Sequence, residues 1–203
     1  MPSRSQYESY LQLPQVKAAL DTIAWAEGGK GYNTLFGGST FESRGYDYNS
    51  HPGAQGFYVA SWNTTAAGRY QIVWSTYKAL APPLGISDFS RRSQDILALA
   101  EASRKGGLSN IVAGNFAAAL QDLGRGGRCA WAALPYSGCG QKQRPLDQTL
   151  NYYKSALAAY GGSPTTLNEN PVSNSDSVVN DNDNEDSSLL YVVGGIVLLA
   201  LLI

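Results

Sequence analysis

Hydrophobic side chains recur at helical spacing near the start of the chain. Val16, Leu20 and Ile23 follow one another at intervals of four and three residues, which places them on one face of a helix. Pro14 suits the first turn, because the N–H that proline lacks would have no partner there. The pattern predicts a helix that begins at Pro14 and ends at Gly28-Gly29, where residues without a Cβ suit a C-terminal cap.

Four further helices are predicted by the same kind of pattern. One covers residues 72–81 and is stopped by Pro82-Pro83, and one runs from the cap residue Ser90 to Lys105, before Gly106-Gly107. The other two are indicated by apolar stripes, formed by Phe116, Ala119, Leu120 and Leu123 and by Leu146, Leu150, Tyr153, Leu157 and Tyr160.

Residues 30–65 show a different pattern, in which glycines and aromatic residues form short groups separated by polar residues. This pattern predicts a short β-meander or long structured loops. Together with the helices it predicts one α+β domain over residues 1–162, mainly α-helical with a small β region.

The composition changes after Gly162. Residues 163–187 are rich in Asn, Asp and Ser and contain no aromatic residue, so they predict a disordered acidic linker. Residues 188–203 carry no charged side chain and predict a hydrophobic C-terminal membrane anchor. The uncharged run Leu189–Ile203 is shorter than the ~20 residues that usually cross a bilayer, and runs of this length are often buried helices. A buried helix would show a polar face, which this run lacks. The first dozen residues contain no sustained apolar run, which argues against a cleaved secretory signal.

Charge is distributed unevenly along the chain. All 15 basic residues and 10 of the 16 acidic residues precede residue 163, so the predicted domain has a surplus of five positive charges. A modestly basic domain suits an anionic polymer. Basic residues do not cluster with interleaved aromatic residues, so we do not expect nucleic acid to be the partner.

Glu27 is the acidic residue whose position indicates chemistry. It continues the apolar stripe of the first helix, where burial and the negative end of the helix dipole both favour the protonated form and raise the pKa. A carboxyl group that stays protonated near neutral pH is the general acid that cleavage of a glycosidic bond needs. Two plainer interpretations remain, a carboxylate that reaches water at the rim of the face or one that accepts N–H bonds from the glycine-rich turn.

The sequence does not indicate a metal site or a cofactor. His51 is the only histidine, and with the cysteines Cys129 and Cys139 it makes no convincing zinc set. We expect His51 to lie in a loop with a local hydrogen bond. The two cysteines are expected either to form a disulfide, if the domain works outside the cytosol, or to fill space as thiols.

Several blocks of sequence resemble the phage lambda endolysin family of lytic transglycosylases, which implies a lysozyme-like fold over residues 15–160. The blocks keep the family's order, and they are Ala24-Trp25-Ala26-Glu27-Gly28, Leu35-Phe36-Gly37-Gly38, Asp47 to His51-Pro52, Ala66-Ala67-Gly68-Arg69-Tyr70-Gln71, Ser93-Gln94-Asp95, Trp131-Ala132-Ala133-Leu134-Pro135 and Gly140-Gln141.

The resemblance implies that Glu27 is the single catalytic acid and base. It would protonate the bond between N-acetylmuramic acid and N-acetylglucosamine in peptidoglycan and then take a proton from the muramic 6-hydroxyl, which closes a 1,6-anhydro ring. One carboxylate is enough for this reaction. The sequence agrees, because no second acid stands close after Glu27, and the next ones are Glu42 and Asp47.

The resemblance also implies a substrate cleft with two further walls. Arg69, Tyr70 and Gln71 correspond to one wall, where a ring can stack on a sugar and an amide can bond its hydroxyl or N-acetyl groups. A tyrosine at a helix start is, however, usually a packing residue. Tyr136 and Gln141 correspond to the remaining cleft segment.

These observations predict a metal-free, cofactor-independent phage lytic transglycosylase whose substrate is peptidoglycan. A hydrolytic muramidase would use the same Glu27, and a wall-binding virion protein would keep the cleft without catalysis. The expected partners are glycan strands, a lipid bilayer through residues 188–203, and other virion proteins. The expected location is the virion, at or in an internal membrane, or the host inner membrane.

Overall fold

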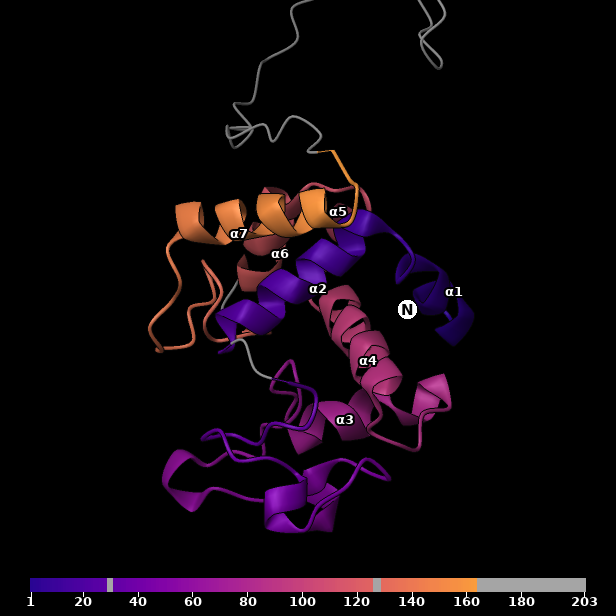
Figure 1. The fold of residues 1–203 in the computed structure, drawn as a ribbon, viewed down its shortest axis with the longest axis vertical. Coiled ribbons are helices and arrows are strands. Elements are labelled where there is room, and N and C mark those ends of the chain that lie inside the picture. The colour runs from indigo at the N-terminus through magenta and orange to yellow at the C-terminus, as the bar shows by residue number, and fades with distance from the viewer. Residues whose placement is uncertain (29–30, 126–128, 164–203) are drawn as a thin grey trace, which may run out of the picture. The chain divides into compact units, whose positions relative to one another are not determined.

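The structure, a computed structural model, describes residues 1–28, 31–125 and 129–163. This part of the chain is mainly α-helical (Figure 1). Its helices are α1 (Arg4–Tyr10), α2 (Pro14–Ala26), α3 (Trp74–Leu80), α4 (Arg91–Arg104), α5 (Leu108–Val112), α6 (Phe116–Gly124) and α7 (Leu146–Ala159). Short 3-10 helices cover Glu42–Arg44, Pro52–Gln55, Ala60–Trp62 and Pro82–Leu84.

Helix α2 confirms the prediction made from its apolar stripe. Pro14 occupies the first turn, and Val16, Leu20 and Ile23 are buried. Glu27 is the C-terminal cap residue, and Gly28 follows it with a φ of 115° that favours glycine. Helix α7 lies along α2 and covers its outer side (Figure 1). The last residue of α2 is therefore held firmly at the edge of the helical core.

Helix α4 is the central helix of the domain. The Oγ of Ser90 accepts a hydrogen bond from the N–H of Ser93 at 3.3 Å, which confirms the predicted cap. Ile96, Leu97 and Leu99 have no exposed surface, because α1, α3 and α5 pack around this helix. The middle of α4, residues 96–100, is accordingly apolar on every side.

Two short helices were not predicted. Helix α1 begins with a capping box, in which Ser3 accepts from the N–H of Gln6 and Gln6 accepts from the N–H of Ser3. Its Tyr7 is fully buried, so α1 packs on the core through this one side chain, which is too little to form a periodic apolar pattern. Helix α5 has five residues, which is too short for a periodic pattern to emerge.

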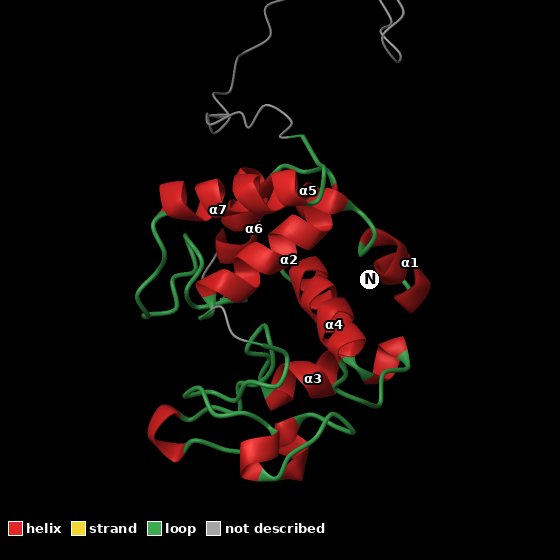
Figure 2. Ribbon diagram, in the orientation of Figure 1, coloured by secondary structure: helices red, strands yellow, loops and turns green. Residues whose placement is uncertain are grey.

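Residues 31–73, which we name the loop region, correct the predicted β region. No strand occurs in the described residues (Figure 2), and pairing is limited to isolated bridges, so the prediction of a small β region is wrong and the alternative of long structured loops is confirmed. The chain reverses too often for a ladder to grow, as at Gly37-Gly38, where two left-handed residues turn the backbone. The bridges are Thr34↔Thr40, Leu35↔Ala67, Val59↔Thr64 and Ala67↔Ile72.

His51 joins the loop region to α3, whose Trp74 and Tyr77 rings lie 5.7 and 5.5 Å from the His51 ring between centroids. Its Nδ1 accepts from the N–H of Gly53 at 2.9 Å, which confirms the expected local bond, and its Nε2 lies 2.8 Å from the carbonyl oxygen of Ile72. The ring is fully buried and packs on Phe89 at 4.6 Å between centroids. Burial lowers the pKa of His51 from its usual 6.5 to about 4, so the side chain is neutral at pH 7.

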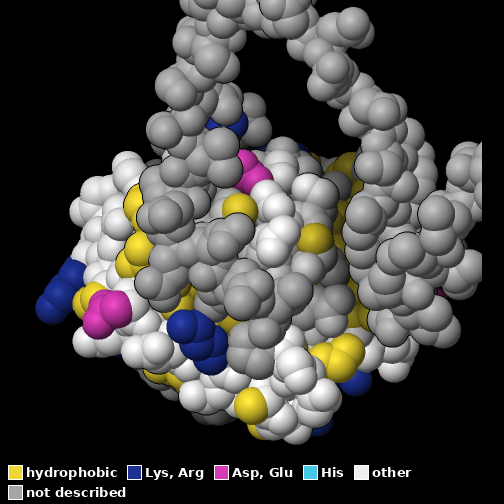
Figure 3. All heavy atoms as spheres, turned by 90° about the horizontal axis from the view of Figure 1, so that it is seen from above, with side chains coloured by type: hydrophobic (Ala, Val, Ile, Leu, Met, Phe, Trp, Pro, Cys, Tyr) yellow, Lys and Arg dark blue, Asp and Glu magenta, His cyan; other side chains and the backbone are white. Residues whose placement is uncertain are grey.

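The predicted linker and membrane anchor fall almost wholly on residues 164–203, which lie outside the described residues. Within the described residues, no helix combines the length and the apolar character that crossing a bilayer requires. On the face seen in Figure 3, basic and acidic side chains are scattered singly over the described surface.

Candidate active site

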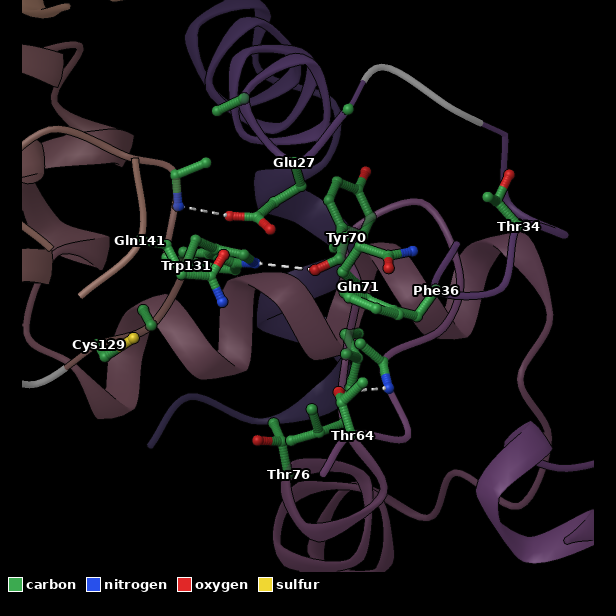
Figure 4. A pocket seen from close by; sticks show the side chains of 18 of the residues that line it. Glu27, Thr34, Phe36, Thr64, Tyr70, Gln71, Thr76, Cys129, Trp131 and Gln141 are labelled. Carbon is green, nitrogen blue, oxygen red and sulfur yellow. Dashed lines mark hydrogen bonds between the residues drawn. The ribbon is translucent and has the colours of Figure 1, made fainter. Parts of the chain in front are cut away.

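Glu27 projects from the end of α2 into a cavity of about 490 Å³, which we name the cleft (Figure 4). Its backbone N–H closes the last turn of α2 by donating to the carbonyl of Ile23 at 3.0 Å. Three segments far apart in sequence complete the walls. They are residues 34–38, residues 64–76 and residues 129–141, to which α4 adds Glu101 and Arg104.

The carboxyl group of Glu27 is partly buried and carries one hydrogen bond from the described residues. Its Oε1 accepts from the N–H of Ala133 at 3.2 Å. Burial raises the pKa of Glu27 above its ordinary value of 4.5, and this effect outweighs the Ala133 bond and the positive charge of Arg144, which both act to lower the pKa. The site therefore favours a protonated carboxyl group, as predicted from the apolar stripe.

Arg144 is a residue of this site that the sequence patterns did not reveal. Its Nε and Nη2 lie 3.4 and 3.5 Å from the carbonyl oxygens of Ala26 and Trp25, the last two residues of α2. Its guanidinium also stacks over the Trp25 ring at 4.7 Å, and Tyr152 stacks on that ring at 4.8 Å. Carbonyl groups at a helix end have no partner within the helix, so Arg144 caps the turn that carries Glu27.

Gln71 lies in the cleft, in the wall where the sequence predicted it (Figure 4). Its backbone is left-handed, with a φ of 49°, and its Nε2 donates to the carbonyl of Gly68 at 2.9 Å. Gly68 is also left-handed, and a Cβ there would collide with the amide of Gln94. Close packing against α4 thus fixes the turn that presents Gln71.

Tyr70 belongs to the wall of the cleft, as predicted, but it is buried within that wall. The residue has no exposed surface, and its hydroxyl donates to Oδ1 of Asp95 at 2.6 Å. Its carbonyl accepts from the indole N–H of Trp131 at 3.1 Å. Tyr70 thus lines the cleft but exposes no surface to it, which favours the packing alternative over stacking on a sugar. Phe36 also lines the cleft, and its ring is only partly buried.

Arg69, which was predicted to contact the substrate, lies outside the lining of the cleft. Its Nη2 forms an ion pair with Asp21 at 2.6 Å, and its Nη1 donates to the hydroxyl of Tyr32 at 2.9 Å. These partners border a second, polar cavity, and Arg69 is absent from the lining of the cleft. The Arg69 guanidinium thus joins α2 to the loop region instead of facing a substrate.

The segment between Cys129 and Cys139 forms the wall opposite the loop region. The two cysteines form a disulfide with Cα atoms 5.6 Å apart, which decides between the two alternatives left open by the sequence. Gln141 lines the cleft as predicted, whereas Tyr136 is 45% exposed and is absent from the lining. The predicted contact of Tyr136 with substrate therefore has no support in this geometry.

Trp131 and the pair formed by Glu101 and Arg104 also line the cleft without having been predicted as site residues. For Trp131 the signal was present, since it belongs to a block that carries the family resemblance. Glu101 and Arg104 are three residues apart on α4, which a charge pattern can show, but nothing in that pattern indicates that they face a cleft. No group of three or more metal-ligating side chains occurs among the described residues.

Comparison with known sequences agrees with this geometry. The sequence model of the Endolysin family matches residues 17–160. The endolysin of Escherichia phage lambda is 34% identical over 153 residues, which cover 70% of this chain and 90% of the phage protein. The endolysin of Escherichia phage P2 is 31% identical over 163 residues, which cover 73% of this chain and 94% of that protein.

Solved structures give the same result. A structure of bacteriophage lambda lysozyme complexed with a chitohexasaccharide matches with a TM-score of 0.62 at 32% identity and covers 75% of this chain and 97% of its own. A second structure of lysozyme from bacteriophage lambda matches with a TM-score of 0.56 at 28% identity and has the same coverage. The chain therefore belongs to the phage endolysin family and has its lysozyme-like fold.

Proposed function

We propose that this chain degrades peptidoglycan as a lytic transglycosylase, with Glu27 as its one catalytic acid and base. The observation that carries the proposal is the position of Glu27, a partly buried carboxyl group with a raised pKa at the end of α2, directed into the cleft. The lambda lysozyme that this chain resembles was solved with a chitohexasaccharide. That oligosaccharide consists of N-acetylglucosamine, one of the two sugars of peptidoglycan.

In the first step, protonated Glu27 gives its proton to the oxygen that links N-acetylmuramic acid to N-acetylglucosamine, and the bond from this oxygen to the muramic C1 breaks. In the second step, the Glu27 carboxylate takes the proton of the muramic 6-hydroxyl, whose oxygen forms the new bond to C1. The products are a 1,6-anhydromuramic end and a free N-acetylglucosamine hydroxyl. Glu27 regains its proton, and no water is consumed.

The surroundings of Glu101 support a mechanism with one carboxylate. A hydrolytic glycosidase usually employs two carboxyl groups, the second of which acts as nucleophile or as base for water. Glu101 is the second acid in the described lining of the cleft, but both of its oxygens accept hydrogen bonds from Arg104 at 2.7 and 2.8 Å. A carboxylate held in this way is a poor nucleophile, which leaves Glu27 to perform both proton transfers.

Gln71 and Gln141 are the proposed substrate-binding residues. Both carry amide groups in the cleft wall, and an amide donates and accepts hydrogen bonds as the hydroxyl and N-acetyl groups of the sugars require. Phe36 supplies the apolar surface on which a sugar face can pack.

Mass analysis of digested sacculi tests the proposal. Digestion in water enriched in heavy oxygen should yield muramic ends that are lighter than reducing ends by one water and contain no heavy oxygen. Reducing ends labelled with heavy oxygen would show a hydrolytic muramidase. Binding to sacculi without any released product would show a wall-binding protein.

We propose further that residues 188–203 attach the enzyme to a lipid bilayer, in a virion or at the host inner membrane. The support is the sequence itself, which has no charged side chain from Ser187 to Ile203 and is rich in Leu, Ile and Val. Each of these residues favours insertion by about 0.3–0.6 kcal/mol. The shortness of the run opposes insertion by fractions of a kcal/mol per Å of mismatch.

Lipid flotation of the full chain and of a truncation that ends at Gly162 tests this attachment. The full chain should float with vesicles, and the truncation should remain in the soluble fraction while keeping its activity on isolated sacculi. Equal behaviour of the two proteins would contradict the attachment.

A further inference from the structure

The last turns of α4 place an ion pair in the cleft wall that the proposed reaction does not use. Glu101 and Arg104 are three residues apart on α4, and both line the cavity that holds Glu27. Among the described residues of that lining, Arg104 is the one cation. Glu101 is buried and Arg104 is more exposed, so Arg104 is the member of the pair that a ligand in the cleft can reach.

The pair is built so that Glu101 fixes the direction of the Arg104 side chain. The Nε and Nη2 groups of Arg104 donate to Oε2 and Oε1 of Glu101 at 2.8 and 2.7 Å, which is the two-pronged geometry of a guanidinium on a carboxylate. The Glu101 side chain is 7% exposed, whereas that of Arg104 is 45% exposed. The Glu101 carboxylate is thus buried, while the Arg104 guanidinium that it holds remains accessible to solvent.

Arg104 keeps donors for a further partner. A guanidinium has five N–H groups, and Glu101 takes one from Nε and one from Nη2. Within the described part of the chain, no hydrogen bond is made by its Nη1. The remaining N–H groups lie on the solvent-exposed side of the guanidinium, whose buried side is bonded to Glu101.

The local charge at this end of the cleft is positive. Lys105 places its Nζ 3.9 Å from Oε1 of Glu101, so two cations stand beside one carboxylate. The same Nζ donates to the carbonyl of Cys129 at 3.4 Å, which ties the end of α4 to the wall formed by residues 129–141. Basic side chains in a partly enclosed site attract anions.

We infer that Arg104 forms a carboxylate subsite of the cleft, which binds an acidic group carried by the muramic acid of the glycan strand. The inference rests on the proposed function, because it takes peptidoglycan as the substrate. Such a carboxylate comes from the peptide stem or, where the stem is absent, from the lactyl group of the sugar itself. Chains of N-acetylglucosamine alone have no carboxylate, so the subsite distinguishes peptidoglycan from chitin.

The pair formed by Arg4 and Glu8 provides a matched control. These residues are also paired on a helix, and Arg4 is as exposed as Arg104, but both partners lie at the surface, with 45% and 39% exposure, and neither lines the cleft. Arg4→Gln therefore removes the same charge and a similar contact at a place that the substrate does not touch.

The test compares initial rates of wild type, Arg104→Gln, Arg104→Lys and Arg4→Gln on intact peptidoglycan and on the same material after its carboxyl groups are converted to amides. Arg104→Gln should raise KM on intact peptidoglycan about five- to tenfold with little change in kcat, because it removes a charge-assisted hydrogen bond. Arg104→Lys should lie between, since lysine keeps the charge without the fork. Arg4→Gln should match wild type.

On the amidated substrate, wild type and Arg104→Gln should have the same KM, and inhibition by chitohexaose should be equal for both. Glycan freed of its stems by an amidase identifies the source of the carboxylate. A persisting difference between the two proteins assigns the lactyl group, and a vanishing difference assigns the stem. An equal loss on intact and amidated peptidoglycan, or no loss on either, would overturn the subsite.

Two further experiments separate the subsite from a loss of stability and from a failure of catalysis. Arg104→Gln removes the two hydrogen bonds that Arg104 donates to the buried Glu101 carboxylate. The double variant Glu101→Gln/Arg104→Gln keeps the pair neutral and able to form a hydrogen bond, so it should show the same selective loss with a melting temperature near that of wild type. Sedimentation with sacculi of Glu27→Gln, with and without Arg104→Gln, measures the subsite without turnover. If wild type releases no product, the proposed function fails, and the sedimentation comparison still decides on the subsite.

Discussion

In α2 and α4 the apolar side chains are buried at helical spacing, whereas the loop region is fixed by hydrogen bonds between single side chains and distant backbone groups. Gln94 of α4 is an example, because its Nε2 donates to the carbonyls of Tyr32 and Phe89 and its Oε1 accepts from the N–H of Arg69. The cleft lies between these two kinds of structure.

The difference explains where chemistry and recognition are placed. As the proposed acid, Glu27 needs a rigid, apolar setting that raises its pKa, and the end of a packed helix supplies that setting. Gln71 needs a strained turn that aims an amide outward, and the loop region supplies it. The acid belongs to the helical side, and the proposed sugar contacts belong mainly to the loops.

Glu27→Gln gives the largest expected effect on activity and none on either kind of structure. Loss of general acid and base catalysis should reduce release of muropeptides by about 10²–10⁴-fold. Because the folded protein raises the pKa of Glu27, the charged form destabilises the fold at neutral pH, and the variant should melt at the same temperature or higher. A folded variant that keeps more than a tenth of the wild-type rate would remove Glu27 from the proposed role.

Tyr70→Ala should break the junction between the helical side and the loop region. A fully buried aromatic ring is lost, so we expect the free energy of unfolding to fall by ~3–5 kcal/mol in urea titration. Tyr70→Phe is the control, because it keeps the ring and loses only the two hydrogen bonds of the hydroxyl, to Asp95 and from Arg69. A stable Tyr70→Ala protein that binds chitohexaose poorly would favour the stacking role over the packing role.

Acid should weaken the loop region through His51. The folded protein holds the pKa of His51 at about 4 against 6.5 when unfolded, so the unfolded chain binds the extra proton between these values and stability falls as the pH drops through this window. The expected loss is about 3 kcal/mol by pH 4. His51→Gln should lack this slope in urea titrations between pH 7 and pH 4. An equal slope in both proteins would assign it to other groups.

Arg144→Gln should produce the smallest effect and sharpen the account of the helical side. The positive charge of Arg144 acts to lower the pKa of Glu27, so its removal should move the alkaline limb of the pH–rate profile to higher pH. Arg144→Lys should restore the wild-type profile in part, since it keeps the charge. A lower rate with an unmoved limb would leave Arg144 with a structural role only.

The sequence predicted the elements whose signal is local and missed those that depend on distant partners. The stripe of Val16, Leu20 and Ile23 and the cap at Ser90 predicted α2 and α4, and Glu27 followed from the same stripe. The burial of Tyr70 depends on Asp95, which lies 25 residues away, and no local pattern encodes that bond.

The missed site residues follow the same rule. Arg144 reaches the end of α2 from more than a hundred residues away. Glu101 and Arg104 form a visible pair, but only the packing of α4 turns them toward the cleft. In residues 30–65, by contrast, the glycines correctly indicated turns. The aromatic residues there suggested strands, but the turns follow one another too closely for a strand to form.

The most direct test of the account is the titration of Glu27 itself, followed by NMR in protein labelled at the glutamate side-chain carboxyl carbon, with Glu27→Gln to assign the signal. The account predicts a pKa above the ordinary 4.5 that coincides with the alkaline limb of peptidoglycan cleavage. A Glu27 that titrates at or below 4.5, and is therefore ionised throughout the active pH range, would contradict its role as the acid.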